Sequence, residues 1–241
     1  MKILLFLIAS FFGANFSYSQ TSQKDSLSDL QIKDAIDVYN HFSADNAPVY
    51  NGSAYIYFTY KMEGDPYFLT GDFTDGWVNY SGRKYDSVLL MFDLARNQLV
   101  ILAPDKISSI ILENDLIDSF SLHGHHFIKL LQDYKQNLNN SGFYDLLYNG
   151  HIQLLVKRAK IIDEQIKDNG VVRIFSAKDR FYVHKDSLYY LVSNKKDVLH
   201  LFKDKAHDIK KYMRKHHLKL RRKTFEEPMV KVTEFYDQLT H

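Results

Sequence analysis

The sequence predicts an α+β fold: a mostly antiparallel β-sheet, in the form of a roll or half-barrel built from successive hairpins, with helices at the carboxyl end. Short apolar and aromatic runs, separated by turn residues, follow one another from residue 53 to about residue 193. Parallel strands would need helical crossovers between these runs, and none is present. From Asn194 onward, apolar residues recur at helical spacing instead.

Turn residues divide the apolar runs into strands and pair them as hairpins. The strongest signal is Asn149-Gly150 between two apolar runs, because both residues tolerate the positive φ of a type I′ turn. Further hairpins are expected across residues 93–97, 113–115 and 184–187. The expected strands cover residues 54–60, 67–70, 77–80, 85–92, 99–103, 107–112, 116–122, 143–148, 151–156, 180–183 and 188–192.

Helical patterns lie at both ends of the strand region. A short helix is expected from Ser28, which forms a capping-box pair with Gln31. After the strands, Asn194 is expected to cap a helix, with Asp197 three residues on. A last helix is expected over residues 227–239, with a proline tolerated in its first turn.

The amino terminus has the pattern of a secretory signal peptide. Lys2 precedes an apolar run of about 11 residues, too short to cross a bilayer as a helix, which takes about 20. Ser17 and Ser19 form the small-x-small arrangement that signal peptidase reads, so cleavage is expected after Ser19. We therefore expect an exported protein of the periplasm or outer envelope. Its expected parts are the signal peptide at 1–19, a flexible leader at 20–27, a helix and antiparallel β region at 28–193, and a helical segment packed on the sheet at 194–241.

Composition excludes several classes of function. The chain has no cysteine, which rules out disulfides, thiol nucleophiles, iron–sulfur clusters and cysteine zinc sites. Its formal net charge is only +2, so overall charge implies no acidic partner. No other run approaches the length of about 18 apolar residues that marks a membrane helix, so no transmembrane segment is expected in the mature chain. The motifs G-x-S-x-G and H-E-x-x-H and the phosphate-binding glycine loop are absent, and no cofactor is expected.

Three segments carry a resemblance to a known family. They are the hairpin at residues 142–150, the basic strand at residues 154–158 and the ending from Lys195 to Tyr236. From about Tyr50 to the end, the chain is similar to uncharacterised, signal-bearing envelope proteins of Gram-negative bacteria. The resemblance implies a compartment and a family, and it implies no mechanism.

Histidines supply one candidate site. If His123-Gly124-His125-His126 is extended, His123 and His125 project from the same face of a strand. Two such imidazoles could bind zinc or copper if a third ligand comes from elsewhere. The alternative is an exposed turn, in which His123, His125 and His126 are merely polar.

A second candidate is the basic stretch at residues 203–223, which holds ten Lys and Arg against two Asp. Such a stretch can contact phosphates of nucleic acid or of anionic lipid head groups, and export argues against nucleic acid. The alternative is a solvated helix face. The candidate contact residues are Lys210, Lys211, Arg214, Lys215, Arg221 and Arg222.

Aromatic residues supply a third candidate, because 15% of the chain is Phe, Trp or Tyr. Exposed rings could stack on sugar faces or bind peptides, or they could fill the core of the sheet. The candidate ligand-binding residues are Tyr55, Tyr57, Trp77 and Tyr80.

Two classes of function remain open on the sequence. The favoured class is a non-enzymatic envelope protein that binds or scaffolds through its sheet and its basic carboxyl end, with envelope components or anionic surfaces as partners. The alternative is a hydrolase or metal-dependent enzyme. It would use the His123–His126 region or carboxylates in the acidic turns, namely Glu63, Asp65, Asp72 and Asp75.

Overall fold

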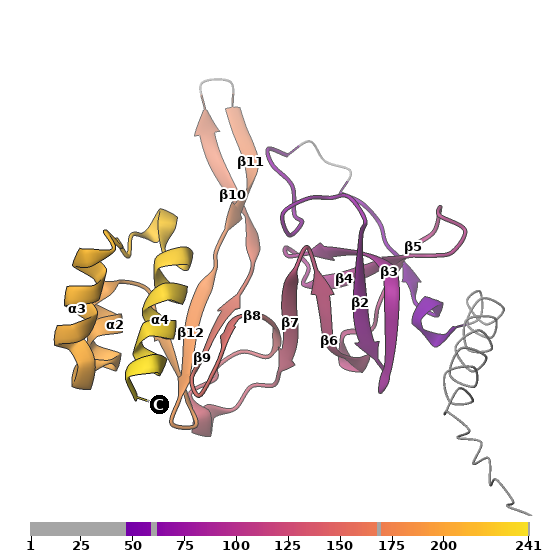
Figure 1. Cartoon of the computed structure of the whole chain (residues 1–241). Helices are drawn as coiled ribbons and strands as arrows, with labels where there is room; N and C mark the ends of the chain where they lie inside the picture. Colours follow the sequence, from indigo (N-terminus) through magenta and orange to yellow (C-terminus); the bar gives the residue numbers. More distant parts are fainter. Residues whose placement is uncertain (1–46, 59–61, 168–169, 241) are drawn as a thin grey trace, which may run out of the picture. The chain divides into compact units, whose positions relative to one another are not determined.

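The computed structural model describes residues 47–58, 62–167 and 170–240, which all belong to one compact unit (Figure 1). The expected signal peptide, leader and first helix lie outside the described residues. Within them, the α+β class is confirmed: every pairing of the named strands is antiparallel, the sheet is open, and three α-helices follow the last strand.

The main sheet has eleven strands in the order β1-β5-β4-β3-β2-β6-β7-β8-β9-β12-β13. Most neighbours are consecutive in sequence because each short turn returns the chain beside the strand it has just left. The strands are β1 (Ser53–Ala54), β2 (Thr74–Tyr80), β3 (Arg83–Asp93), β4 (Gln98–Leu102), β5 (Ser109–Ile111), β6 (Ile117–Leu122), β7 (His125–Leu130), β8 (Gly142–Asn149), β9 (Gln153–Lys157), β12 (Arg180–Lys185) and β13 (Leu188–Val192).

Two strands leave the main sheet as a ribbon, β10 (Lys160–Lys167) with β11 (Gly170–Ala177). The strands expected from the sequence did not include this ribbon, although Asn169-Gly170 is a turn signal of the same kind as Asn149-Gly150. Several of its side chains stay exposed, among them Ile166 at 91% and Val171 at 63%. Backbone hydrogen bonds of Glu63 with Arg173 and Phe175 attach the ribbon to the segment before β2.

An aromatic cluster forms the core over β3, β6, β7 and β8. Phe120 and Phe127 face each other across β6 and β7 and stack at 4.7 Å between ring centroids. Phe92 and Phe143 meet these rings edge-on at 5.2 to 5.4 Å, and they meet each other edge-on at 5.9 Å. Edge-to-face pairs of this kind add to the hydrophobic stabilisation of a core.

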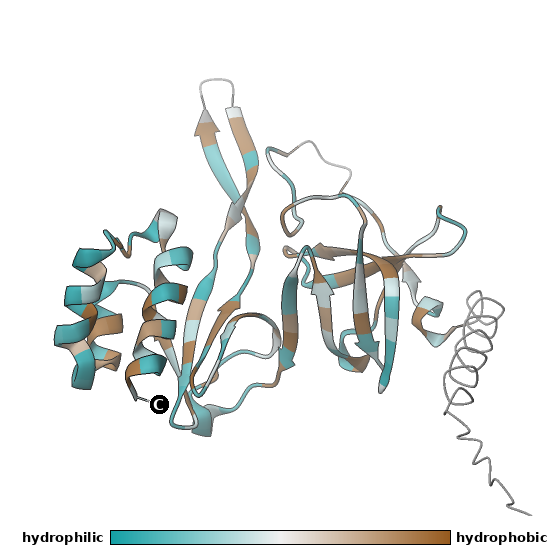
Figure 2. Ribbon diagram, viewed as in Figure 1, coloured by the Kyte–Doolittle hydropathy of each residue, from teal (hydrophilic) through white to brown (hydrophobic). Residues whose placement is uncertain are grey.

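Three helices cover the other end of the sheet: α2 (Lys195–Leu201), α3 (Ala206–Lys215) and α4 (Glu226–Thr240). The α4 helix contacts β8 and β9, and α2 contacts β13. A second core lies between helices and sheet, with Phe202 stacked on Tyr236 at 4.0 Å. Figure 2 shows the alternation of apolar and polar residues along the strands that this packing requires.

The predicted cap and last helix are confirmed. Asn194 accepts hydrogen bonds from the backbone N–H groups of Lys196 and Asp197, at 2.8 and 3.1 Å. The last helix runs one residue beyond the expected range at each end, with Pro228 in its first turn.

The Asn149-Gly150 pair joins a hairpin, but the predicted type I′ turn is wrong. Asn149 pairs with Gln153, so the loop holds three residues, and neither Asn149 nor Gly150 has positive φ. Gly150 is needed for space instead, since a Cβ atom there would lie 2.1 Å from Asp237 Oδ2. Two-residue turns with positive φ at both positions occur at Ser81-Gly82, His123-Gly124 and Asp186-Ser187.

Three other strand predictions are corrected. Residues 107–112 and 116–122 do not pair: β5 lies between β1 and β4, whereas β6 lies between β2 and β7. A strand was expected over residues 54–60, but of its described residues 54–58 only Ala54 lies in a strand, β1. A strand was also expected over residues 67–70, which instead form only an isolated bridge at Tyr67. Local sequence marks strands well, but pairing depends on which apolar faces meet in the folded sheet.

Candidate functional site

The three candidate metal ligands are not brought to one point. His123 lies in the turn between β6 and β7, with Nε2 3.4 Å from Thr74 Oγ1. His126 packs on Trp77 at 5.2 Å between ring centroids, whereas His125 meets the edge of Phe68. Among residues 47–58, 62–167 and 170–240, no group of three or more His, Asp or Glu side chains is placed to hold a metal ion.

His125 instead contacts a buried carboxylate that the sequence did not single out. Its Nδ1 lies 2.8 Å from Oδ2 of Asp145, a β8 residue with no exposed surface. The same oxygen accepts hydrogen bonds from Nε and Nη2 of Arg158, at 3.0 and 2.6 Å. A buried carboxylate requires this kind of compensation, because removing an unpaired charge from water is very costly.

Arg158 connects this carboxylate to the start of α4. Its guanidinium donates to both oxygens of Glu226, at 2.6 and 2.9 Å, and to Asp179 at 2.9 Å. Burial by itself lowers the pKa of Arg158, but the carboxylates of Glu226 and Asp145 raise it by a larger amount. The net effect is a raised pKa, so the guanidinium stays charged. One cation therefore ties β8, the segment before β12, and α4 together.

The candidate aromatic residues lie in different surroundings. Tyr80 is buried in the main core, and Tyr55 is buried elsewhere with its hydroxyl donating to Asp93 at 2.8 Å. Tyr57 is half exposed and meets Tyr55 edge-on. Trp77 is partly buried beneath the Lys84 ammonium, which lies 5.2 Å from its ring centroid. The four rings do not form one stacking platform.

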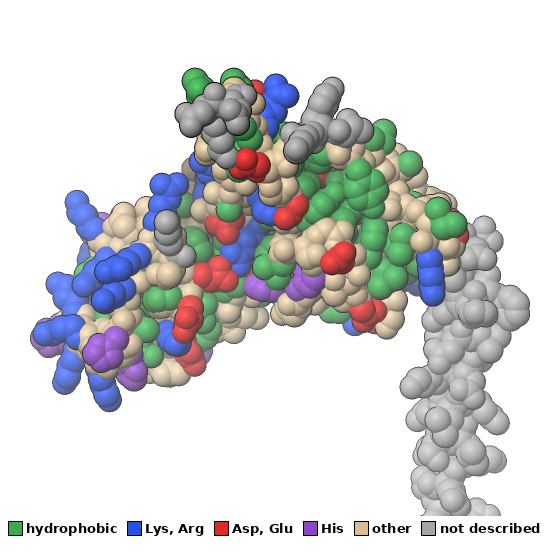
Figure 3. All heavy atoms as spheres, turned by 90° about the horizontal axis from the view of Figure 1, so that it is seen from above, with side chains coloured by type: hydrophobic (Ala, Val, Ile, Leu, Met, Phe, Trp, Pro, Cys, Tyr) green, Lys and Arg blue, Asp and Glu red, His purple; other side chains and the backbone are tan. Residues whose placement is uncertain are grey.

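The basic candidates share one feature: they are exposed and make no ion pair with any carboxylate that the structure describes. The apolar side of α3 is buried through Ile209 and Met213, and Tyr212 stacks on Phe235 of α4 at 4.0 Å. The charged residues therefore lie on the outward side of α3 and in the segment after it. Figure 3 shows Lys and Arg side chains gathered over this helical end. We call the basic face the exposed residues Lys210, Lys211, Arg214, Lys215, Lys219, Arg221 and Arg222.

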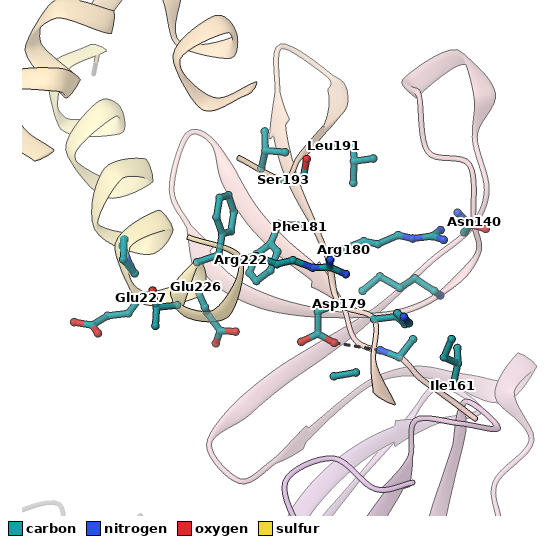
Figure 4. Close-up of a pocket in the computed structure, with 18 residues that line it drawn as sticks. Asn140, Ile161, Asp179, Arg180, Phe181, Leu191, Ser193, Arg222, Glu226 and Glu227 are labelled. Carbon is teal, nitrogen blue, oxygen red and sulfur yellow. Dashed lines mark hydrogen bonds between the residues drawn. The ribbon is translucent and has the colours of Figure 1, made fainter. Parts of the chain in front are cut away.

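An open cleft of about 1320 Å³ lies beside the Arg158 cluster, between the strands and the start of α4 (Figure 4). Its apolar walls come from β10, β12, β13 and the first turn of α4. Its polar residues come from β9, β12 and α4 and from the segments that precede β8, β12 and α4. The lining residues include Asn140, Lys157, Ile161, Lys178, Asp179, Arg180, Phe181, Leu191, Arg222, Phe225, Glu226 and Glu227.

Carboxylates and cations in this cleft differ in their partners. Asp179 and Glu226 are bound to Arg158, and Glu227 lies 2.6 Å from Lys231. Lys178 is paired with Asp163 at 3.6 Å. By contrast, three cations have no carboxylate within ion-pair distance among the described residues: Lys157, Arg180 and Arg222.

Lys157 is the most constrained of these cations. Its ammonium donates to the backbone oxygen of Ser141 at 2.6 Å and lies 4.9 Å from the Tyr144 ring centroid. Arg180 stands directly opposite it in the pairing of β9 with β12. Burial, with a further contribution from the Arg180 charge, lowers the pKa of Lys157 to about 8.

Sequence reasoning missed Asp145, Lys157, Arg158 and Arg180. A signal existed for the first three, because Asp145 and the Lys157-Arg158 pair interrupt or end apolar strand runs. A charged residue at an inward strand position needs a partner, and this need could have placed them at one site. The sequence could not show that β12 and α4 bring the other partners.

The structure contains no helix, within the described residues, that is long and apolar enough to span a membrane. Comparison with known proteins found no matching family model, curated protein or solved structure.

Proposed function

We propose that this chain is an exported, non-enzymatic protein of a bacterial envelope, of the Gram-negative type that its sequence resembles, and that it attaches to anionic surfaces through the basic face. The proposal keeps the signal peptide expected from residues 1–19. Export removes the protein from most nucleic acid, so anionic lipid head groups are the favoured partner.

The absence of internal ion pairs at the basic face carries the proposal. All seven of its side chains are exposed, and none lies within ion-pair distance of a carboxylate in the described parts of the chain. Clustered like charges repel one another and destabilise a folded protein, so an unpaired cluster is favoured where an external anion compensates it. A bilayer bearing anionic lipids attracts each nearby Lys or Arg by about 1 kcal/mol.

The test is vesicle sedimentation with the mature protein, using phosphatidylcholine vesicles with and without phosphatidylglycerol. Binding is expected only with phosphatidylglycerol, and it should fall in high salt, where the screening length shortens from about 10 Å at 0.1 M to about 3 Å at 1 M. The Lys210→Gln/Lys211→Gln variant should bind about 30-fold more weakly.

A matched control is Lys84→Gln/Lys106→Gln, which removes the same charge from exposed positions on other elements. This control should bind as the parent protein does. Equal weakening by both variants would show that net charge alone is responsible, and it would contradict a role for the basic face.

One observation favours a second candidate function, a hydrolase that uses His125. The contact of its Nδ1 with buried Asp145 has the geometry of a histidine oriented as a general base. Turnover of an activated ester that is lost in His125→Gln, with unchanged folding by circular dichroism, would support this alternative. Unchanged background turnover would refute it.

A further inference from the structure

The cleft beside α4 has two properties that belong together in a ligand site. Part of its lining is apolar: Leu191 and Ile161 are exposed at 57% and 41%, and Phe181 and Phe225 meet edge-on at 5.0 Å on the helix side. Another part presents cations that have no carboxylate partner among the described residues. Small-molecule sites are characteristically apolar concavities with a few polar groups that fix orientation.

The placement of Lys157 and Arg180 is unfavourable without a ligand. Like charges directly opposite each other on neighbouring strands destabilise a sheet. Lys157 is also partly removed from water, and its near neighbours are a carbonyl oxygen and an aromatic ring, not a carboxylate. An anion bound by both side chains would convert this repulsion into two charge-assisted hydrogen bonds.

Each carboxylate of the cleft has a cationic partner. Asp179 and Glu226 share the single positive charge of Arg158 with Asp145, and Glu227 is paired with Lys231. In the view of Figure 4, Arg180 lies between Arg222 and Asn140, with Glu226 and Glu227 on the α4 side of the cleft. Glu226 and Glu227 therefore lie apart from Arg180 (Figure 4), whereas the neighbouring carboxylate of Asp179 is bound to Arg158.

We propose that this cleft binds an amphiphilic anion, with its carboxylate or phosphate group held by Lys157 and Arg180 and its hydrocarbon portion placed along Leu191 and Ile161. Arg222 extends the cationic part toward the basic face, of which it is also a member. The volume of about 1320 Å³ leaves room for a ligand with an extended apolar portion.

The test is isothermal titration calorimetry with four probes below their aggregation concentrations: decanoate, decyl phosphate, decanol and inorganic phosphate. Decanoate and decyl phosphate distinguish the two head groups, and at least one should bind saturably at one site. Decanol and inorganic phosphate should bind at least about tenfold more weakly, because each lacks one half of the recognised chemistry. Equal binding of inorganic phosphate would overturn the amphiphile assignment.

Variants locate the site. Arg180→Gln and Lys157→Met should each weaken binding about tenfold or more, since each removes a charge-assisted hydrogen bond. Leu191→Ser should weaken it several-fold, and it should change the stability of the fold little because Leu191 is exposed. Lys178→Gln is the matched control, because Lys178 lines the same cleft but is already paired with Asp163.

Binding that survives in Arg180→Gln/Lys157→Met, or no saturable binding by either anionic probe, would overturn the proposal. Its failure is distinguishable from failure of the surface attachment proposed above. Arg180→Gln should sediment with phosphatidylglycerol vesicles as the parent protein does, and Lys210→Gln/Lys211→Gln should keep its affinity for the soluble probes.

Discussion

Replacing Arg158 tests whether one buried cation holds the strands and α4 together. Arg158 is 9% exposed, and its guanidinium is paired with three carboxylates, of which Asp145 is fully buried. In Arg158→Met, the only ionisable side chain left in contact with Asp145 among the described residues would be His125, at 2.8 Å. Asp179 and Glu226 are partly exposed, so water can replace Arg158 there.

The expected loss is therefore dominated by Asp145. Breaking a buried ion pair from one side costs about 3 to 5 kcal/mol. Asp145 keeps one partner, so we expect about 3 kcal/mol for Arg158→Met at neutral pH. Arg158→Lys should lose less, because an ammonium keeps the charge but cannot bind two carboxylates with the same fork geometry.

The assay is urea unfolding followed by circular dichroism, completed as a double-mutant cycle with Asp145→Asn. The double variant Arg158→Met/Asp145→Asn should lose less than the sum of the two single losses, because it leaves no buried charge. Lys231→Gln, which breaks an exposed pair with Glu227, is the control and should change stability little. A loss below about 1 kcal/mol in Arg158→Met, or strict additivity in the cycle, would refute the reasoning.

Two further predictions concern Gly150 and Lys157. Gly150→Ala should destabilise the protein by about 1 to 3 kcal/mol, because the new Cβ atom would displace the Asp237 carboxylate, which accepts a hydrogen bond from the backbone N–H of His151. Urea unfolding measures this loss. An unchanged unfolding midpoint would contradict the close approach of Gly150 to Asp237. Lys157→Met should stabilise the free protein at pH 7, since folding lowers the pKa of this amine to about 8. Between that pH and the ordinary lysine pKa near 10.4, the unfolded chain binds more protons than the folded one, so parental stability rises with pH and the advantage of the variant should shrink. Urea unfolding of the parent and the variant at pH 7 and about pH 10 would show this. A stability advantage of Lys157→Met that grows with pH would contradict the prediction.

Local sequence patterns were enough to predict the fold class and most of the strands and helices. Alternating apolar runs and turn residues specify antiparallel strands, because side-chain period and turn chemistry act over only a few residues. Asn194 and the apolar stripe of α4 identified the helices for the same local reason. The exposed position of the basic face also followed from the sequence, since the buried residues Ile209 and Met213 mark the opposite side of α3.

Tertiary structure decided what the sequence could not. Pairing of β6 with β2, and not with β5, depends on strands far apart in sequence. His125 was a candidate from its neighbours alone, but its partner Asp145 is twenty residues away on the next strand. The cleft forms only where Lys157, Arg180 and the first turn of α4 come together. Whether a charged side chain there is paired or unpaired depends on which residues the fold places beside it. Local patterns specify which segments are strands or helices, whereas a site depends on contacts between segments, which are set by the packing of the whole sheet and its helices.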